Sequence, residues 1–323
     1  MNELNLKNLK EKSNIIDPVT ILNKYALFST YIDDIIFIKK EPIFCGGIIK
    51  DLGRNVYNLK INEFVGYLSL KTHLNLRLSS NLIVKLNEVN KHLIFSLPYA
   101  SYAMNILRKI NPKLGQNVVV IGLNFFSLLL FKLMRLSGAN IYIFNLNSYP
   151  NTLMLDEKEK PFIMDKYNDY LKTISIDSLI LTKLSEEILE FVGKIRSNLK
   201  VQRAYLIEHH LNPNLKAKIN LHIDQIMKYD KGFFDPDYNK GIKYPFSYVR
   251  WDFKRNLEYF VSLVEKNLIK LNYFKIYEVK LNSVKEIKEK IGILNEELLN
   301  DKLDQHQEKS LILFHIQSKE NIQ

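Results

Sequence analysis

The segment Val120-Ile-Gly-Leu-Asn-Phe-Phe-Ser127 has the residue spacing of a turn that holds the pyrophosphate of a dinucleotide. Such a turn needs small residues at three places: for the bend from strand to helix, for the approach of backbone amides to the phosphates, and for close packing of the helix on the strand. Gly122 stands at the first place, Asn124 at the second and Ser127 at the third. Asn tolerates a positive φ better than most residues and Ser is small, so the sequence predicts that the turn forms.

Further residues of a cofactor site follow from the same pattern. Phe125 and Phe126 complete the turn, and Asn145, with Asn147 close by, replaces the acid that usually ends the second strand and holds the ribose. An amide can still hydrogen-bond a ribose, and the lost charge relieves the repulsion of a 2′-phosphate. We add Thr182, at the end of a later strand. Two interpretations stay open: the site retains NAD or NADP, or the scaffold no longer binds a cofactor.

A polar and aromatic cluster follows in residues 248–256. We predict that Tyr248, Arg250, Trp251 and Arg255 bind the substrate, because arginine suits bidentate contacts with a phosphate or carboxylate. In the alternative interpretation, Trp251 anchors the loop on the sheet and the arginines pair with acids of the same region, which are Asp235, Asp237 and Asp252.

His209 and Cys45 are the remaining candidates for chemistry. His209 follows a predicted strand at its carboxyl end, where parallel sheets bind ligands, so we include it in the substrate site. Cys45 is the only cysteine, and it stands beside Gly46-Gly47 without a His or acid at ligand spacing. We therefore expect a buried core residue, no metal and no disulfide framework, and a reducing, cytoplasmic location.

The elements that would position these residues alternate between strand and helix. Residues 117–122 form a continuous apolar run, residues 127–137 a largely apolar helix and residues 141–144 a second buried strand, which together make a βαβ unit. A strand at 178–182, a helix at 185–196 and a strand at 201–207 continue the alternation. This order predicts an α/β protein with a doubly wound parallel sheet.

A second, smaller β region precedes this sheet. Residues 25–95 read mainly as strands, and the leucines between Tyr67 and Leu78 alternate with polar residues as in a half-buried antiparallel sheet. We expect residues 1–20 to form a polar arm, 99–110 a helix, and 228–250 a long loop. Asp252 is predicted to cap one helix, Ser283 and Glu286 to begin another that ends near Leu299, and residues 311–315 to form a last strand.

Composition excludes several classes of partner. The formal net charge is +11, but the lysines are scattered and no run exceeds two, so we predict no nucleic-acid binding. The polar N-terminus is no signal peptide. The most apolar stretch, residues 125–136, is short and carries Lys132 and Arg135, so we expect no membrane partner.

Several segments resemble the zinc-type alcohol dehydrogenases and their relatives, the medium-chain dehydrogenases/reductases. Residues 112–145 resemble the core of that family, and Leu97-Pro-Tyr-Ala-Ser-Tyr-Ala103 the helix that enters it. Cys45-Gly-Gly-Ile-Ile-Lys50 resembles the strand that opens the family's GroES-like sheet, and Asn62-Glu-Phe-Val65 stands where the family has Gly-Asp-Arg-Val. The resemblance continues at Thr72-His73 and Asn81–Lys85.

The most specific match is to one branch of that family. Residues 229–238, 241–245, 248–251 and 255–256 are similar to the dehydrogenase-like half of bi-domain oxidoreductases, which are associated with surface-polysaccharide and sugar-derivative metabolism. The resemblance covers roughly residues 40–315. It implies a truncated GroES-like β region at 1–96, a Rossmann-type domain at 97–268 and a return to the GroES-like domain at 269–323.

The resemblance implies an NAD(P)-dependent, zinc-independent oxidoreductase that acts on a sugar or nucleotide-sugar derivative. We find no segment that replaces the family loop with the usual catalytic Cys or Ser, so the catalytic residue stays unknown. The alternative is a non-catalytic scaffold or partner subunit that pairs with a separate oxidoreductase chain. Because members of the family commonly dimerise through the sheet edge, the resemblance also implies a possible homodimer.

Overall fold

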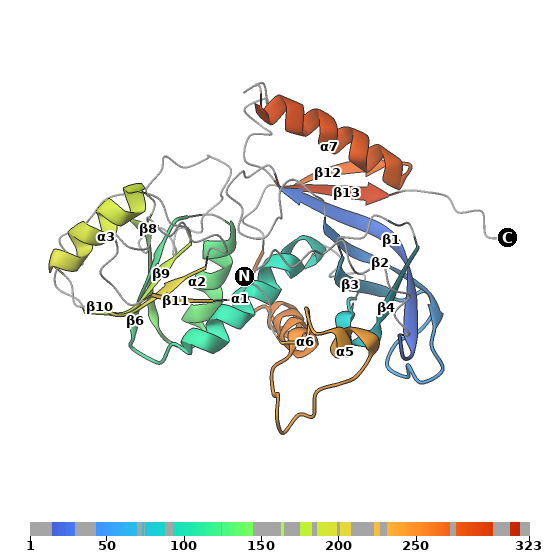
Figure 1. Ribbon diagram of the computed structural model, residues 1–323, viewed down its shortest axis with the longest axis horizontal. Helices are drawn as coiled ribbons and strands as arrows, with labels where there is room; N and C mark the ends of the chain where they lie inside the picture. Colours follow the sequence, from blue (N-terminus) through green and yellow to red (C-terminus); the bar gives the residue numbers. More distant parts are fainter. Residues whose placement is uncertain are drawn as a thin grey trace.

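Two sheets and the helices packed on them make up the computed structural model (Figure 1). The structure describes residues 15–29, 43–69, 73, 75–87, 93–123, 125–144, 163–164, 175–182, 186–198, 201–207, 223–226, 231–271, 276–299 and 311–316.

One sheet has six strands, all parallel, in the order β11-β10-β9-β6-β7-β8. Numbered along the chain, this is the order 3-2-1-4-5-6 of the doubly wound dinucleotide-binding fold, read from the β8 edge. The predicted fold class is therefore confirmed. The strands are β6 (Asn117–Ile121), β7 (Asn140–Phe144), β8 (Ile163–Met164), β9 (Ile176–Leu181), β10 (Val201–Leu206) and β11 (Ile223–Gln225).

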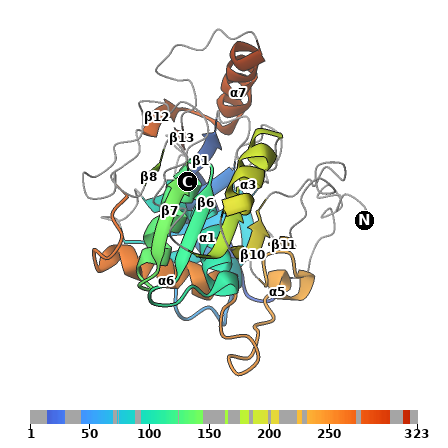
Figure 2. The same ribbon diagram turned by 90° about the vertical axis from the view of Figure 1, so that its left-hand side faces the viewer.

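Helices cover both faces of this sheet, which explains the continuous apolar run of its central strand β6. Val118 and Val120 face the core shared with α1 (Leu97–Ile110) and α2 (Phe125–Arg135). Val119 and Ile121 belong to a second core with Ile188 and Val192 of α3 (Glu186–Asn198). Figure 2 shows the parallel strands between these helices.

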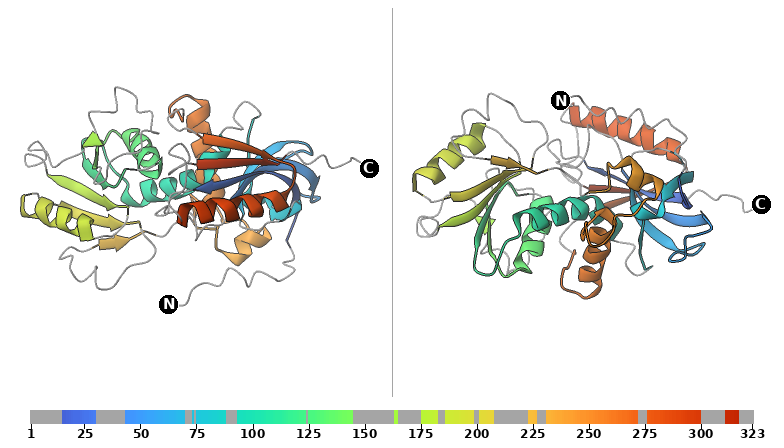
Figure 3. Two further views of the ribbon diagram at one scale, coloured as in Figure 1. Left: turned by 90° about the horizontal axis from the view of Figure 1, so that it is seen from above. Right: turned by 60° about the horizontal axis from the view of Figure 1, so that its bottom comes forward.

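The second sheet has seven strands and is mainly antiparallel. Its order is β12-β13-β1-β2-β3-β5, and β4 also pairs with β1; only β12 and β13 are parallel, joined through α7 (Val284–Leu299). Residues from both ends of the described chain thus share one sheet (Figure 3). The strands are β1 (Pro18–Ser29), β2 (Ile43–Leu52), β3 (Phe64–Ser69), β4 (Asn75–Ser79), β5 (Val84–Lys85), β12 (Ile276–Leu281) and β13 (Leu311–Ile316).

Three predicted segments differ from the structure. Pro18–Thr20, expected in the polar arm, belong to β1 because they pair with Ser79, Leu78 and Arg77 of β4. The alternating run from Tyr67 to Leu78 is divided between β3 and β4, which pair with different neighbours. Helix α2 begins two residues before the predicted start because Phe125 and Phe126 are buried in the core.

The predicted loop at 228–250 contains a short helix, α5 (Pro236–Lys240). Asp235 caps its start, since its Oδ1 accepts a hydrogen bond from Asp237 N at 2.9 Å, and Gly241 ends it with φ +119°. The predicted cap of α6 (Phe253–Glu265) is confirmed: Asp252 Oδ1 accepts from Arg255 N at 2.9 Å. The box before α7 also forms, with Glu286 N donating to Ser283 Oγ at 3.4 Å.

Candidate functional site

The carboxyl ends of β6 and β9 lie side by side at the point where the strand order of the parallel sheet reverses. The chain runs from β6 towards β7 and β8 on one side, and continues through β9 to β11 on the other. Open α/β sheets bind ligands at such a point, because the loops that leave adjacent strands diverge there. Gly122 follows β6 and Thr182 follows β9, so the structure brings these two predicted residues together.

Gly122 makes the bend that the sequence predicts. Its φ is +102°, a conformation that residues with side chains rarely adopt. A Cβ atom at this position would overlap Thr182 Oγ1. Gly122 N donates to Phe144 O at 2.9 Å, which extends the pairing of β6 with β7 to the start of the turn. Conformation and space therefore both require glycine here.

Thr182 closes the space beside Gly122 and joins β9 to β6. Its exposed fraction is 3%, its Oγ1 donates to Ile121 O at 2.8 Å, and its N donates to the same oxygen at 3.2 Å. The hydroxyl proton is thus used inside the protein. Through these contacts, Thr182 holds the turn at Gly122 in place.

Phe125, Phe126 and Ser127 begin α2, and all three are buried. The Phe125 ring packs edge-on against Tyr99 and Phe95, with centroids 4.5 and 5.7 Å apart. Their side chains therefore face the core, and only main-chain groups of this segment are placed to meet a ligand. The first N–H groups of a helix lack partners within the helix and carry its positive dipole end, which suits a phosphate.

Tyr102 of α1 belongs to this site and was not predicted. Its hydroxyl donates to Ile207 O at 2.5 Å, just beyond the carboxyl end of β10, and its ring stacks on Phe126 with centroids 5.0 Å apart. Tyr102 is fully buried. It ties the start of α2 to the carboxyl edge of the sheet. The only sequence signal is a tyrosine at an apolar helical position, whose hydroxyl must find a partner when buried.

Asn124, Asn145, Asn147 and His209 lie outside the described residues. Their roles in cofactor or substrate binding stay predictions.

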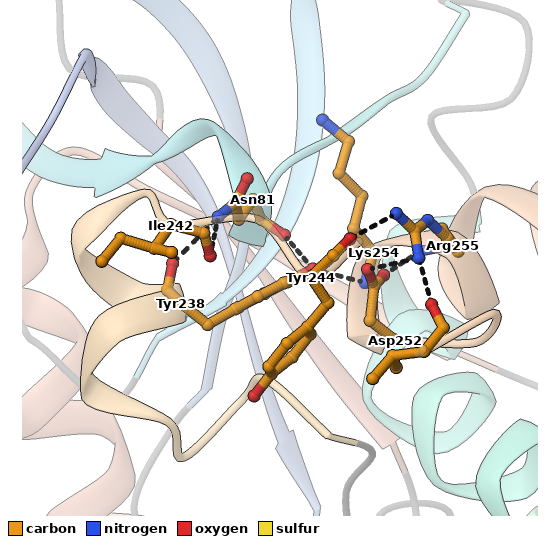
Figure 4. Close-up of polar contacts among 8 residues, drawn as sticks. Asn81, Tyr238, Ile242, Tyr244, Asp252, Lys254 and Arg255 are labelled. Atoms are coloured by element: carbon orange, nitrogen blue, oxygen red, sulfur yellow. Dashed lines mark hydrogen bonds and ion pairs between the residues drawn. The ribbon is translucent and has the colours of Figure 1, made fainter. Parts of the chain in front are cut away.

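Arg255, one of the residues predicted to bind substrate, makes its contacts within the loop before α6 (Figure 4). Its guanidinium donates to Val249 O and, at 3.0 Å, to Tyr244 O, and lies 3.3 Å from Asp252 Oδ2. These contacts fold residues 244–249 back onto the start of α6. For Arg255 the geometry matches the alternative interpretation, in which the arginine pairs with Asp252 and orders the loop.

A buried polar contact holds the same loop on the β-rich part (Figure 4). Asn81 lies in the 3₁₀ helix η2 (Ser80–Leu82), and its Nδ2 donates to Tyr238 O at 3.0 Å and to Ile242 O at 3.3 Å. Tyr238 Oη donates back to Asn81 O at 3.2 Å. Burial raises the pKa of Tyr238, so its hydroxyl stays protonated. Burial also lowers the pKa of Lys254, whose Nζ donates to Ser80 O at 2.8 Å.

Trp251 packs on α1 and α6, whereas the alternative interpretation placed it on the sheet. The guanidinium carbon of Arg108 lies 3.7 Å from its ring centroid, and the Tyr259 ring meets it edge-on at 5.4 Å. Stacking of arginine on an indole is favourable because the ring face is negative. Arg250 approaches the same ring at 5.5 Å and is exposed, as is Tyr248 at 86%.

The two groups of predicted residues contact α1 at different positions. Tyr102 contacts Phe126, next to the turn at Gly122, whereas Arg108 contacts Trp251. Tyr102 and Arg108 are six residues apart on α1, which is about 9 Å along the helix axis. Trp251 thus contacts α1 and α6, and Arg255 contacts Asp252 and the loop before α6, away from the turn at Gly122. In the part of the chain that the structure describes, no three His, Cys, Asp or Glu gather as a metal-ligand group. None of the described helices combines the length and apolarity needed to cross a bilayer. Cys45 is buried, as predicted.

Solved structures that are similar to this one include dehydrogenases and reductases. Galactitol-1-phosphate dehydrogenase from Escherichia coli is 12% identical with a TM-score of 0.58, covering 93% of each chain. For 2R,3R-butanediol dehydrogenase from Bacillus subtilis the identity is 13% and the TM-score 0.55, over 95% of this chain and 94% of that one. For CAD from Helicobacter pylori, complexed with NADP(H), the values are 14% and 0.54, over 93% and 91%.

The chain has the fold of the medium-chain dehydrogenases and reductases. No family model matches the sequence, and no curated protein matches it. The likeness therefore lies in structure, where the expected combination of a Rossmann domain and a GroES-like domain is confirmed.

Proposed function

We propose that the protein is an NAD(P)-dependent oxidoreductase whose cofactor binds across the carboxyl ends of β6 and β9. The observation that carries this proposal is the turn at Gly122, where a positive φ and the contact with Thr182 exclude any side chain. A turn of this kind brings backbone close to a pyrophosphate. The structural neighbours support the proposal, since two of them are dehydrogenases and a third is complexed with NADP(H).

The residues at this turn fit a dinucleotide. Main-chain amides between Gly122 and Ser127 would hold the pyrophosphate at the start of α2, and Asn145 and Asn147 are the sequence's candidates for the ribose. The nicotinamide, when bound, supplies hydride transfer. The protein's own part is to fix the turn: Tyr102, Phe126 and Thr182 hold α2 and β9 against it.

The substrate class proposed is a sugar or nucleotide-sugar derivative, and the reaction needs no zinc. The resemblance of the loop at 229–256 to bi-domain oxidoreductases of sugar metabolism supports the substrate class. The neighbour named for galactitol-1-phosphate points in the same direction. Zinc independence rests on the single cysteine, which is buried among the core residues of the β-rich sheet.

A second function is favoured by the residues that replace two glycines and the ribose-binding acid. With Asn124, Ser127 and Asn145 at those places, the chain is a candidate non-catalytic subunit that pairs with a separate oxidoreductase chain. A shared fold does not by itself preserve activity.

Titration with NADH and NADPH distinguishes the two functions. A cofactor that binds only the folded state, at a concentration one hundredfold above its dissociation constant, stabilises the protein by about 2.7 kcal/mol, which thermal unfolding measures. We expect such a shift with at least one of the two cofactors. No shift with either would leave the non-catalytic function.

A matched pair of variants locates the binding. Asn124→Asp adds a carboxylate two residues after Gly122 and should weaken cofactor binding at least tenfold through repulsion of the pyrophosphate. Gln116→Glu makes the same charge change before the amino end of β6. The new carboxylate keeps the acceptor for Lys113 N, now 2.9 Å from Gln116 Oε1, and should leave binding unchanged. Equal affinity of both variants would place the cofactor elsewhere.

A further inference from the structure

The loop between α5 and α6, residues 241–252, exposes large apolar side chains. The exposed fractions are 52% for Ile242, 63% for Phe246 and 86% for Tyr248. Isolated exposed apolar residues are common, but three within seven residues of one loop are a local concentration, and concentrations of exposed apolar residues mark binding surfaces.

Internal contacts order this loop. Tyr248 N and Val249 N both donate to Pro245 O at 3.0 Å, and the Arg255 guanidinium donates to Val249 O and Tyr244 O. At its first residues, Ile242 O accepts from the buried Asn81. The apolar side chains are therefore presented on a fixed backbone, so that little conformational entropy is lost when they bind.

The charge of the loop indicates the kind of partner. Between Asp237 and Asp252 the sequence has Lys240, Lys243 and Arg250 and no acidic residue. Lys243 and Arg250 are exposed beside the apolar residues. Contact between two copies through this loop would bring like charges together on a chain of net charge +11. The complementary surface is thus negatively charged.

The shape of the loop favours a flat surface. In Figures 1 and 2 the 241–252 loop projects beyond α5 and α6, away from both sheets. Exposed aromatic residues in a projecting loop, with cations in the same loop, match the interface of an anionic lipid bilayer, where rings enter the headgroup layer and basic side chains meet lipid phosphates and carboxylates.

We propose that the 241–252 loop is a peripheral docking site for an anionic lipid surface. Phe246 and Tyr248 enter the interfacial layer with Ile242 behind them, and Lys243 and Arg250 contact the headgroups. The sequence predicts no membrane partner because its apolar runs are short; the exposure of these side chains is visible only in the folded chain. The proposal does not depend on cofactor binding.

Co-sedimentation of the full chain with vesicles tests it. We expect binding to phosphatidylcholine vesicles that contain about 30% phosphatidylserine, little binding to pure phosphatidylcholine, and release at about 0.5 M salt, where charges are screened. Failure to bind the anionic vesicles overturns the proposal, and would be the result if the loop serves an acidic protein surface.

Two pairs of variants assign the binding to the loop. Phe246→Ser with Tyr248→Ser should reduce the bound fraction at least tenfold, whereas Leu114→Ser with Tyr57→Ser, two residues that are each 84% exposed elsewhere, should change it less than twofold. The second pair reverses charge. Lys243→Glu with Arg250→Glu should also reduce the bound fraction at least tenfold, whereas Lys50→Glu with Lys280→Glu, at two other exposed lysines, makes the same change in net charge and should change the bound fraction less than twofold. All eight side chains are exposed or near the surface, so thermal unfolding should confirm that the variants fold. Loop variants that bind as their controls do would overturn the assignment.

Discussion

At the scale of single residues, Gly122 and Thr182 are coupled through one small space. Gly122→Ala combines an unfavourable positive φ with an overlap against Thr182 Oγ1, and should destabilise the fold by about 2–4 kcal/mol. Thr182→Ala alone loses the hydrogen bond to Ile121 O, about 1 kcal/mol. It also removes the atom that a Cβ would meet, so the double variant should be about 1 kcal/mol more stable than the sum of the single losses.

Denaturant unfolding of the four proteins in this cycle measures the coupling. Gly193→Ala is the matched control, since it lies on α3 with nothing within 4 Å of an added Cβ, and should be neutral or stabilising. Strict additivity of Gly122→Ala and Thr182→Ala would mean that backbone strain alone requires glycine at this turn.

The sequence predicts part of this site, for a physical reason. The bend at Gly122 is a local event, so a glycine between a buried strand and a buried helix is enough to place it. The contact between Tyr102 and Ile207 joins residues far apart in the chain, and a periodicity carries no information about such pairs. In the same way, an arginine such as Arg255 is a residue type that often binds anions. The carbonyl groups that accept its hydrogen bonds, Val249 O and Tyr244 O, can be identified only in the folded loop.

At the scale of elements, the start of α5 depends on an acid that is also hydrogen-bonded by a tyrosine. The Tyr244 hydroxyl donates to Asp235 Oδ2, and this contact is the main reason that the pKa of Asp235 lies below its usual value. Burial, with the contact to Asp235, raises the pKa of Tyr244 to about 12. The depressed carboxyl pKa contributes stability above the unfolded value of about 3.9 that is lost as the pH falls through the folded pKa. The raised tyrosine pKa contributes stability that is complete below about pH 10 and is lost as the pH rises towards 12.

Tyr244→Phe should therefore cost about 1–2 kcal/mol between roughly pH 5 and 9, and the cost should shrink as the pH falls through the lowered pKa of Asp235. Thermal unfolding of both proteins across this pH range measures the difference. Tyr57→Phe is the control, because Tyr57 is exposed and donates only to the neutral Asn55 Oδ1 at 3.3 Å; its small effect should not vary with acid. A cost of Tyr244→Phe that stays constant from pH 7 down to the acid unfolding of either protein would contradict the contact.

Two elements that were not predicted carry signals in the sequence. Asp235-Pro236 is a cap followed by a proline suited to the first helical position, and Gly241 is a stop, so a one-turn helix was readable in the loop. In β12, Val279 and Leu281 alternate with Glu278 and Lys280, a period-two pattern. The parallel pairing of β12 with β13 depends on α7 between them, which no local pattern reveals.

At the scale of the whole molecule, α6 lies between the two sheets, and the ends of the loop before it are held by both parts. Helix α6 packs on α1, which covers the parallel sheet, and also on η2 and β5 of the β-rich part. Asn81 fastens the loop from the β-rich side through Tyr238 O and Ile242 O, while Trp251 rests on Arg108 of α1. The segment from 231 to 265 thus links both parts, and its attachment should determine whether they unfold together.

Asn81→Ala tests this link. The side chain is 2% exposed, and its removal takes away the donor to Ile242 O and one of the donors to Tyr238 O, which keeps Gly241 N at 3.1 Å; the loss should cost about 1–3 kcal/mol. Trp251 fluorescence reports the loop, whereas far-UV circular dichroism reports both sheets. We expect the two signals to change at one temperature in the wild type, and the Trp251 signal to change first in Asn81→Ala. Asn58→Ala, at an exposed asparagine of the same β-rich part, should keep the two transitions together. Coincident and unshifted transitions in Asn81→Ala would show that the packing of α6 on α1 holds the parts together without this contact.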